Sequence, residues 1–158
     1  MAGKVNPIPD SYRRVNACLI VNGAAKAIEF YTDVFGATER MRTPGPGDTI
    51  IHSELEIGDS VVMVEDASEF MGTQAPPTDG FPGSQEYHYI YVEDVDATID
   101  QAVKHGATVK RPATDQFYGD RDGYIVDPFG HGWVVASHVE DVSGEEMAKR
   151  MNEMFGQG

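Results

Sequence analysis

His52 and Glu54 are the residues of this sequence whose types and spacing best suit metal chemistry. They stand two positions apart in a segment rich in strand-forming residues, so both side chains point to one face of a strand. Divalent metals favour imidazole and carboxylate ligands, and His88 is the candidate third ligand if a one-residue bulge turns it. We favour a hydrogen-bonded strand histidine beside a surface carboxylate, because a third ligand is missing. We therefore expect no cofactor, with a divalent metal as the alternative.

Three further side chains are candidates for chemistry or binding. Cys18 has no suitably placed histidine beside it in the sequence, which favours a small buried hydrophobe over a nucleophile. Tyr118 and Arg121 belong to a polar stretch around residues 119–123 that we interpret as a loop. From a loop, both side chains could reach over the mouth of a site and meet an anionic or carbonyl group.

The elements that must position these residues begin with a strand at 13–21 and a helix. Asn22 predicts the helix N-cap, and Gly36 stands where a C-terminal cap belongs. Strands at 37–42, 49–57 and 60–65 follow, the last two joined by a hairpin at residues 58–59. The helix has one apolar face, formed by Ala24, Ala27, Ile28, Tyr31 and Phe35.

The same β-α-β-β-β order returns in the second half of the chain. A strand at 87–92 precedes a helix capped by Asp94 and ended by Gly106, and strands at 123–127 and 132–136 flank a tight reversal at 127–130. The phrase Gly-Ala-Thr at 36–38 recurs at 106–108, a shift of 70 (106 minus 36). This repetition predicts an internal duplication. The apolar face of the second helix carries Val95, Ile99, Ala102 and Val103.

The fold that we expect is therefore α+β, with two tandem βαβββ modules at 13–65 and 87–139 whose curved mixed sheets surround a cleft. Residues 1–12 read as a flexible arm, and residues 66–86 as a Pro- and Gly-rich linker or functional flap. A helical tail occupies 140–158, where Ser143 and Glu146 form a capping box. Its apolar stripe suits either packing against its own module or a subunit contact, and consists of Met147, Met151, Met154 and Phe155.

Several phrases in these modules resemble the vicinal oxygen chelate superfamily. They are Ala-Ile-Glu-Phe-Tyr at 27–31, Phe-Gly-Ala at 35–37 and Asp-Pro-Phe-Gly-His at 127–131. This group includes glyoxalases, extradiol dioxygenases, fosfomycin-resistance transferases and bleomycin-binding proteins. Phrases at 57–60, 92–96 and 116–121 are most similar to its PhnB-like subgroup. The resemblance covers 13 to about 139, and function must still be argued from the site, because one fold hosts many chemistries.

The resemblance also indicates where metal ligands would stand, in the first and last strand of each module. Counting from the matching phrases places these positions at Asn16, Met63, Tyr87 and Val134. Asn, Met, Tyr and Val cannot supply the imidazole and carboxylate set that divalent metals require. The sequence therefore predicts that the superfamily's metal-dependent chemistry is absent.

What remains at these positions is the lining of a small-molecule pocket. By strand alternation Asn16 and Cys18 share a face, as do Tyr87 and Tyr89. Apolar walls, aromatic rings and a few polar groups characterise ligand sites, although the cleft could instead be filled by its own side chains. We predict a metal-free binder of a hydrophobic or aromatic small molecule; the alternative is a lyase or isomerase with a metal at His52, Glu54 and His88. The predicted ligand-binding residues are Asn16, Cys18, Met63, Tyr87, Tyr89, Tyr118, Arg121 and Val134.

Composition limits the partners of the protein. The formal charge of −14, from 12 basic and 26 acidic side chains, argues against nucleic acid and against an anionic membrane surface. One cysteine, no long apolar run and no signal-like N-terminus predict a cytoplasmic protein. We also expect a homodimer, because the long linker permits exchange of halves and the tail offers an apolar stripe. Whether the modules pair within one chain or between chains is left open.

Overall fold

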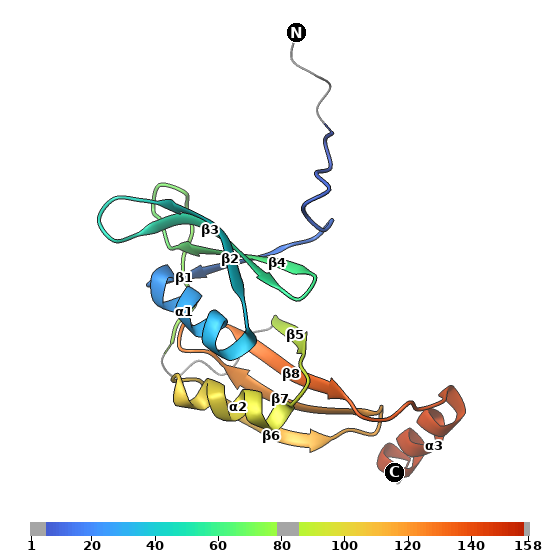
Figure 1. Ribbon diagram of the computed structural model, residues 1–158. Helices are drawn as coiled ribbons and strands as arrows, with labels where there is room; N and C mark the ends of the chain where they lie inside the picture. The colour runs from blue at the N-terminus through green and yellow to red at the C-terminus, as the bar shows by residue number, and fades with distance from the viewer. Residues whose placement is uncertain (1–5, 79–85, 157–158) are drawn as a thin grey trace. The chain divides into compact units, whose positions relative to one another are not determined.

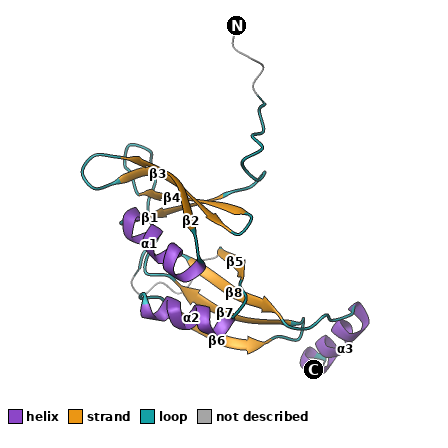
Figure 2. Cartoon of the chain, viewed as in Figure 1, coloured by secondary structure: helices purple, strands orange, loops and turns teal. Residues whose placement is uncertain are grey.

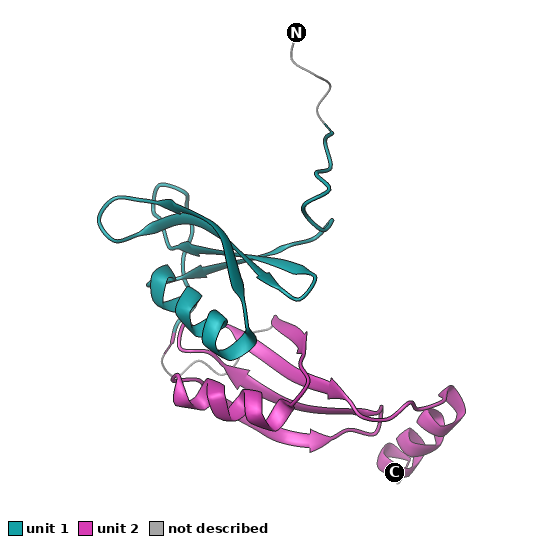
Figure 3. Ribbon diagram, in the orientation of Figure 1, with its two compact units in different colours: residues 1–77 teal, residues 78–158 magenta. Residues whose placement is uncertain are grey.

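A computed structural model describes residues 6–78 and 86–156 of the chain. These residues form two compact units, 1–77 and 78–158 (Figure 3), and each unit is described by itself. The predicted flexible arm lies partly outside the described residues, at 1–5, and the predicted linker does so at 79–85. None of the described helices is long and apolar enough to cross a membrane.

Unit 1 is a four-stranded mixed sheet with one helix (Figures 1 and 2). Its strands run in the order β1-β4-β3-β2, with β1 parallel to β4 and the other neighbours antiparallel. The elements are β1 (Ala17–Val21), α1 (Ala24–Phe35), β2 (Thr38–Pro44), β3 (Ile50–Ile57) and β4 (Ser60–Asp66).

Unit 2 repeats this arrangement in the order β5-β8-β7-β6, with β5 parallel to β8. A third helix follows the second sheet. The predicted α+β fold of two βαβββ modules and a C-terminal helix is therefore confirmed. The elements are β5 (Tyr87–Tyr91), α2 (Val95–Lys104), β6 (Thr108–Asp115), β7 (Asp120–Val126), β8 (Gly132–His138) and α3 (Gly144–Phe155).

Helices α1 and α2 each bury an apolar stripe on one face of their own sheet, as the sequence periodicity predicted. In unit 1 the fully buried side chains include Leu19, Leu55 and Val64, which face the buried side of α1. In unit 2 Ile125 and Val135 do the same beneath α2. Val103, expected on the apolar face of α2, is instead 47% exposed. The opposite face of each sheet is left for polar and aromatic side chains, and this is where the candidate site lies.

The N-terminus of α1 is capped differently from the prediction. Asn22 is not the cap; the N-cap is Gly23, whose φ of 94° lies in the left-handed region that glycine tolerates. The capping acceptor comes from β4, because Asp66 Oδ1 accepts hydrogen bonds from the backbone N–H groups of Gly23 (2.8 Å) and Ala24 (2.9 Å). Gly36 ends the helix with φ 66°, as predicted, and Asp94 caps α2 by accepting from Ala97 N–H at 2.9 Å.

The tail helix begins where the capping box placed it. The Ser143 hydroxyl accepts a hydrogen bond from Glu146 N–H at 3.2 Å. Arg150 ties the helix to the preceding segment by donating to the carbonyl of Phe117 and to Glu140, at 3.2 Å and 2.7–2.9 Å. No described residue of α3 is buried, and the outer part of the predicted stripe, Met151, Met154 and Phe155, is 45%, 58% and 69% exposed.

Candidate functional site

The sheet of unit 2 exposes three tyrosines on the side opposite α2. Tyr87, Tyr89 and Tyr91 alternate along β5 and are 56%, 44% and 62% exposed. We call the surface that they form the tyrosine face. Its floor comes from β8, since Val134 pairs with Tyr89 and Ala136 pairs with Tyr91 in the parallel register, and both floor residues are buried. Of the predicted ligand-binding residues, the structure thus brings Tyr87, Tyr89 and Val134 together.

Two buried carboxylates from β7 hold the tyrosine hydroxyls. Asp120 Oδ2 accepts hydrogen bonds from Tyr91 at 2.7 Å and from Tyr89 at 3.2 Å, and Asp122 Oδ2 accepts a longer one from Tyr89 at 3.3 Å. The two carboxylates are 5% and 0% exposed. Such burial is tolerated because each carboxylate is paired with a cation: Asp120 with His138 at 2.8 Å, and Asp122 with Arg111 at 2.6 Å.

Tyr118 completes this network from the turn before β7. Its hydroxyl donates a short hydrogen bond to Asp122, which also accepts from Gln116 Nε2 at 3.0 Å. Burial, aided by the bond to Asp122, raises the pKa of Tyr118 to about 12. Burial likewise raises the pKa of Tyr89, and the bond to Asp120 raises that of Tyr91. All three phenols therefore stay neutral near pH 7 and serve as hydrogen-bond donors and aromatic surfaces rather than as bases.

Arg121 does not reach this face, and the position predicted for it is wrong. The polar stretch at 119–123 is not a loop, because β7 begins at Asp120. Alternation along β7 turns Asp120 and Asp122 to the tyrosine face and Arg121 to the helix side. There the guanidinium donates to Asp96 of α2 at 2.8 Å and to Asp115 at 3.0 Å. Arg121 thus joins α2 to the sheet and is not close to Tyr89.

The predicted site residues of unit 1 lie on the sheet side opposite α1, with one exception. Cys18 and Met63 are paired across β1 and β4, on the face that alternates with buried Leu19 and Val64. Cys18 is exposed, so the prediction of a small buried hydrophobe is wrong, because its strand position faces away from α1. Partial desolvation of the thiol, together with Glu65, raises its pKa to about 11. Asn16 precedes β1 and closes a turn instead, because its side chain bonds both N–H and C=O of Arg13, at 3.2 and 2.7 Å.

His52 and Glu54 lie on this same face of unit 1, in a polar cluster. His52 Nδ1 is 2.7 Å from Glu65 and its Nε2 is 3.2 Å from Glu54. Glu54 is 3% exposed, so it is a buried and not a surface carboxylate, which corrects the prediction. It also accepts from the Tyr12 hydroxyl at 2.5 Å and from Arg40 Nε at 3.1 Å.

The charges in this cluster are mutually stabilised. Burial alone would raise the pKa of Glu54, but hydrogen bonds from Tyr12 and His52 and the charge of Arg40 outweigh it and hold that pKa below its usual value. The hydrogen bond to Glu65, and then that to Glu54, raises the pKa of His52 despite partial burial. Both ring nitrogens of His52 thus face carboxylate oxygens within this cluster.

His88 does not join them. It occupies the alternate position of β5, on the helix side, where its ring packs 4.8 Å from that of Trp133. Burial lowers its pKa. Within 6–78 and 86–156, no group of three or more His, Cys, Asp or Glu side chains is arranged to hold a metal ion.

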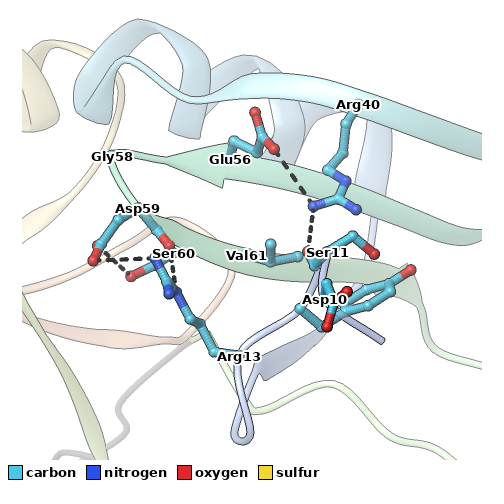
Figure 4. Close-up of a pocket in the computed structure, with 10 residues that line it drawn as sticks. Asp10, Ser11, Arg13, Arg40, Glu56, Gly58, Asp59, Ser60 and Val61 are labelled. Atoms are coloured by element: carbon cyan, nitrogen blue, oxygen red, sulfur yellow. Dashed lines mark hydrogen bonds and ion pairs between the residues drawn. The ribbon is translucent and has the colours of Figure 1, made fainter. Parts of the chain in front are cut away.

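A separate polar pocket of about 290 Å³ lies in unit 1 between residues 10–13 and the β3–β4 hairpin (Figure 4). Arg40 projects into it and donates to the Ser11 carbonyl at 3.1 Å, while Arg13 pairs with Asp59 of the hairpin. This pocket was not predicted, because the sequence assigned residues 1–12 to a flexible arm.

The sequence model of the Glyoxalase/Bleomycin resistance protein/Dioxygenase superfamily matches residues 13–135. The chain belongs to this superfamily. The matched range contains the first βαβββ module and most of the second, ends within β8 and excludes the helix α3.

Three individual proteins illustrate what this chain is similar to. The uncharacterized protein Rv0887c of Mycobacterium tuberculosis is 37% identical over 135 residues, which cover 85% of this chain and 79% of that protein. A gene product of Arabidopsis thaliana of known structure is 27% identical with a TM-score of 0.62, over 79% of this chain and 98% of that one. The PhnB protein of Bacillus cereus, at 18% identity and a TM-score of 0.59, covers 79% of this chain and 99% of its own and shares the fold.

Sequence reasoning missed the residues that organise both faces. These are the acceptors and cations around the tyrosines and around His52. A strand start at residue 120 would have revealed the first set, because Asp120 and Asp122 would then alternate onto the face of Tyr89 and Tyr91. The missed residues are Tyr12, Arg40, Glu65, Arg111, Gln116, Asp120, Asp122 and His138.

Proposed function

We propose that the protein binds a hydrophobic or aromatic small molecule on the tyrosine face, without a metal. The observation that carries this proposal is the row of three half-exposed rings above a buried apolar floor. Soluble proteins seldom leave such a row uncovered, and a concave or flat aromatic surface with few polar groups is typical of ligand sites. Rings stack favourably on other aromatic groups in offset or edge-to-face geometry.

The network beneath the rings supports the same function. Because Asp120 and Asp122 hold the hydroxyls of Tyr89, Tyr91 and Tyr118, the rings are already oriented before a ligand arrives. Side chains that are already ordered in the free protein lose little further conformational entropy on binding, which favours affinity. The hydroxyls of Tyr89 and Tyr91 are engaged with these carboxylates, so these two residues offer a ligand chiefly their aromatic rings.

The alternative, a lyase or isomerase with a divalent metal at His52, Glu54 and His88, has less support. His88 lies on the helix side of its sheet, and both other residues are committed to partners within their cluster. We also propose membership of the PhnB-like subgroup, on the phrases at 57–60, 92–96 and 116–121; a phylogenetic tree of the superfamily that places the chain outside this subgroup would refute that placement.

Thermal unfolding with a panel of aromatic and heterocyclic compounds tests the binding function. At a ligand concentration of 100 times Kd, binding adds about 2.7 kcal/mol to the free energy of unfolding. For a chain of this size that is a rise in Tm of roughly 5–10 °C. The double variant Y89A/Y91A should lose this rise, whereas F70A, which removes a 95% exposed ring from the other unit, should keep it.

Two results would contradict the proposal. One is the absence of stabilisation by every compound in the panel; the other is equal stabilisation of wild type and Y89A/Y91A. A separate assay addresses the enzyme alternative, by measuring turnover of glyoxalase-type substrates after addition of Ni²⁺, Zn²⁺, Mn²⁺ or Fe²⁺ to tag-free protein. Metal-dependent activity that is lost in H52Q would establish the alternative in its place.

A further inference from the structure

The N-terminal arm places a phenol on a buried carboxylate. The hydroxyl of Tyr12 donates to Glu54 Oε1 at 2.5 Å, and Glu54 is 3% exposed in the sheet of unit 1. Residues 6–16 contain no helix or strand, so Tyr12 comes from a segment without backbone ladder bonds. A side chain from an irregular segment thus satisfies one of the most buried charges of the sheet.

The surroundings of Tyr12 recognise both parts of a phenol. The hydroxyl is bound by the carboxylate, and the guanidinium carbon of Arg40 lies 5.1 Å from the ring centroid, within the range of a cation–π contact. Arg40 Nε also pairs with Glu54 Oε2 at 3.1 Å, and His52 Nε2 lies 3.2 Å from Oε1, the oxygen that accepts from Tyr12. Glu54 is therefore held ionised and oriented by two groups besides Tyr12. An ionised acceptor makes a stronger hydrogen bond to a phenol than a neutral one does.

The arm itself is held by few bonds. Arg40 donates to the Ser11 carbonyl, and Arg13 bonds the carbonyl and side chain of Asp59 (Figure 4). Asp10, Ser11 and Arg13 are exposed, and the side chains of the Arg13–Asp59 pair are 63% and 86% exposed, where such a pair contributes little. The adjoining pocket of about 290 Å³ gives a displaced or incoming ring space beside Arg40.

We propose that Glu54, Arg40 and His52 form a binding subsite for the hydroxyl and ring of a small phenol, and that Tyr12 occupies it in the free protein. The subsite consists of residues of unit 1 that are not part of the tyrosine face, so it extends the proposed function. A phenolic ligand replaces Tyr12 on Glu54, and the arm leaves the sheet. The hydrogen bond from Tyr12 to Glu54 breaks, and one from the ligand hydroxyl to Glu54 forms in its place. Ligand entry and arm release are therefore one event.

Competition with a tethered group sets the expected size of the effect. A side chain on a short tether competes at an effective concentration in the millimolar range. With one charge-assisted hydrogen bond between Tyr12 and Glu54, molecules with the arm bound outnumber those with the arm released by about tenfold or more. Removing Tyr12 abolishes this competition, so Y12A should bind a free phenol at least about tenfold more tightly than the wild type does.

Titration of full-length protein with p-cresol, followed by amide chemical shifts, tests the proposal. We expect saturable shifts in residues 40–42, 52–56 and 61–65, and about a tenfold lower Kd in Y12A than in wild type. Toluene, which lacks the hydroxyl, should bind Y12A more weakly. In Y12A/E54Q the neutral amide should weaken p-cresol binding about fivefold or more relative to Y12A. F70A, which removes a 95% exposed ring that belongs to neither proposed site, is the control and should behave as wild type.

The same titration contains the outcomes that overturn the proposal. Equal p-cresol affinity of wild type and Y12A does so, as does equal affinity of Y12A for p-cresol and toluene. Shifts confined to residues 87–91 and 132–138 would place the phenol on the tyrosine face, which overturns the subsite and leaves the proposed function intact. The folded amide spectrum of each variant confirms that E54Q acts on binding; if E54Q is unfolded, R40Q replaces it, with the same fivefold loss expected.

Discussion

Replacement of Asp127 by alanine should destabilise unit 2 more than any other single change in its turns. The carboxylate is 3% exposed and closes the reversal between β7 and β8. Oδ1 accepts from the backbone N–H groups of Phe129 (2.9 Å) and His131 (3.0 Å), and Oδ2 accepts from Trp133 Nε1 at 2.9 Å. The substitution leaves three donors without this acceptor.

The magnitude follows from these three bonds. Hydrogen bonds to a charged group contribute about 1.5–3 kcal/mol each, and the indole N–H is enclosed whereas the two backbone donors lie at a turn that water can reach. We therefore expect D127A to lower the free energy of unfolding by about 3–5 kcal/mol, less than the simple sum. For a chain of this size the loss in Tm is roughly 6–20 °C.

The variant D127N distinguishes the contributions of the two carboxylate oxygens of Asp127. Asparagine can keep its carbonyl on the two backbone donors but presents an NH₂ group to the indole N–H, so it should cost about 1–3 kcal/mol. Because Trp133 is the one tryptophan in the sequence, its fluorescence follows unfolding of unit 2 in urea. The variant W133F should reduce the cost of D127N. The reasoning fails if D127A costs less than about 1 kcal/mol, or if D127N is as damaging as D127A.

Three further predictions concern unit 1, Arg121 and the tail. The pKa of Glu54 is lowered on folding, so its contribution to stability is present above about pH 4.3 and is lost as the pH falls through the folded pKa. The pKa of His52 is raised on folding, so its contribution is present below about pH 6.5 and is lost as the pH rises through the folded pKa. Plots of Tm against pH should therefore flatten on the acid side in E54Q and on the alkaline side in H52Q, and unchanged slopes would contradict this. R121A should leave ligand-induced stabilisation unchanged, because Arg121 faces α2. Loss of the ligand-induced rise in Tm in R121A would show that Arg121 takes part in binding. We also predict a homodimer whose contact includes the exposed side of α3, so light scattering should show dimeric wild type and monomeric M151E/M154E, while a monomeric wild type would refute it.

The fold was predictable because its signals are local and repeated. The 3.6-residue spacing of Ala24, Ala27, Ile28 and Tyr31 defines a buried helix face without knowledge of the rest of the chain. Glycines with positive φ at 36, 58 and 130 mark the ends of elements in both modules. The capping of α1 was not predictable in this way, because its acceptor, Asp66, is more than forty residues away in sequence.

The site was predicted less well, and the reason is a strand boundary. β7 begins at Asp120 and not at Gly123, so residues 120–122 also alternate between the two faces of the sheet, and Asp120 and Asp122 face the tyrosines. Arg121 was therefore assigned to the wrong side, and both aspartates were overlooked. The Tyr12–Glu54 contact spans 42 residues from an irregular arm, and no periodicity in the sequence reports such a pairing.

The position of Cys18 beside Glu65 has a consequence for the redox chemistry of the chain. Alkylating and oxidising reagents attack the thiolate, so reactivity falls with the thiolate fraction. A thiol pKa of about 11, two units above the ordinary 9.0, lowers that fraction about a hundredfold near neutral pH. Desolvation of the thiol, and after it the charge of Glu65, therefore lowers the reactivity of the one sulfhydryl of the sequence toward such reagents. A fluorophore or spin label for this protein would need a cysteine introduced elsewhere, and Cys18 could then be left in place.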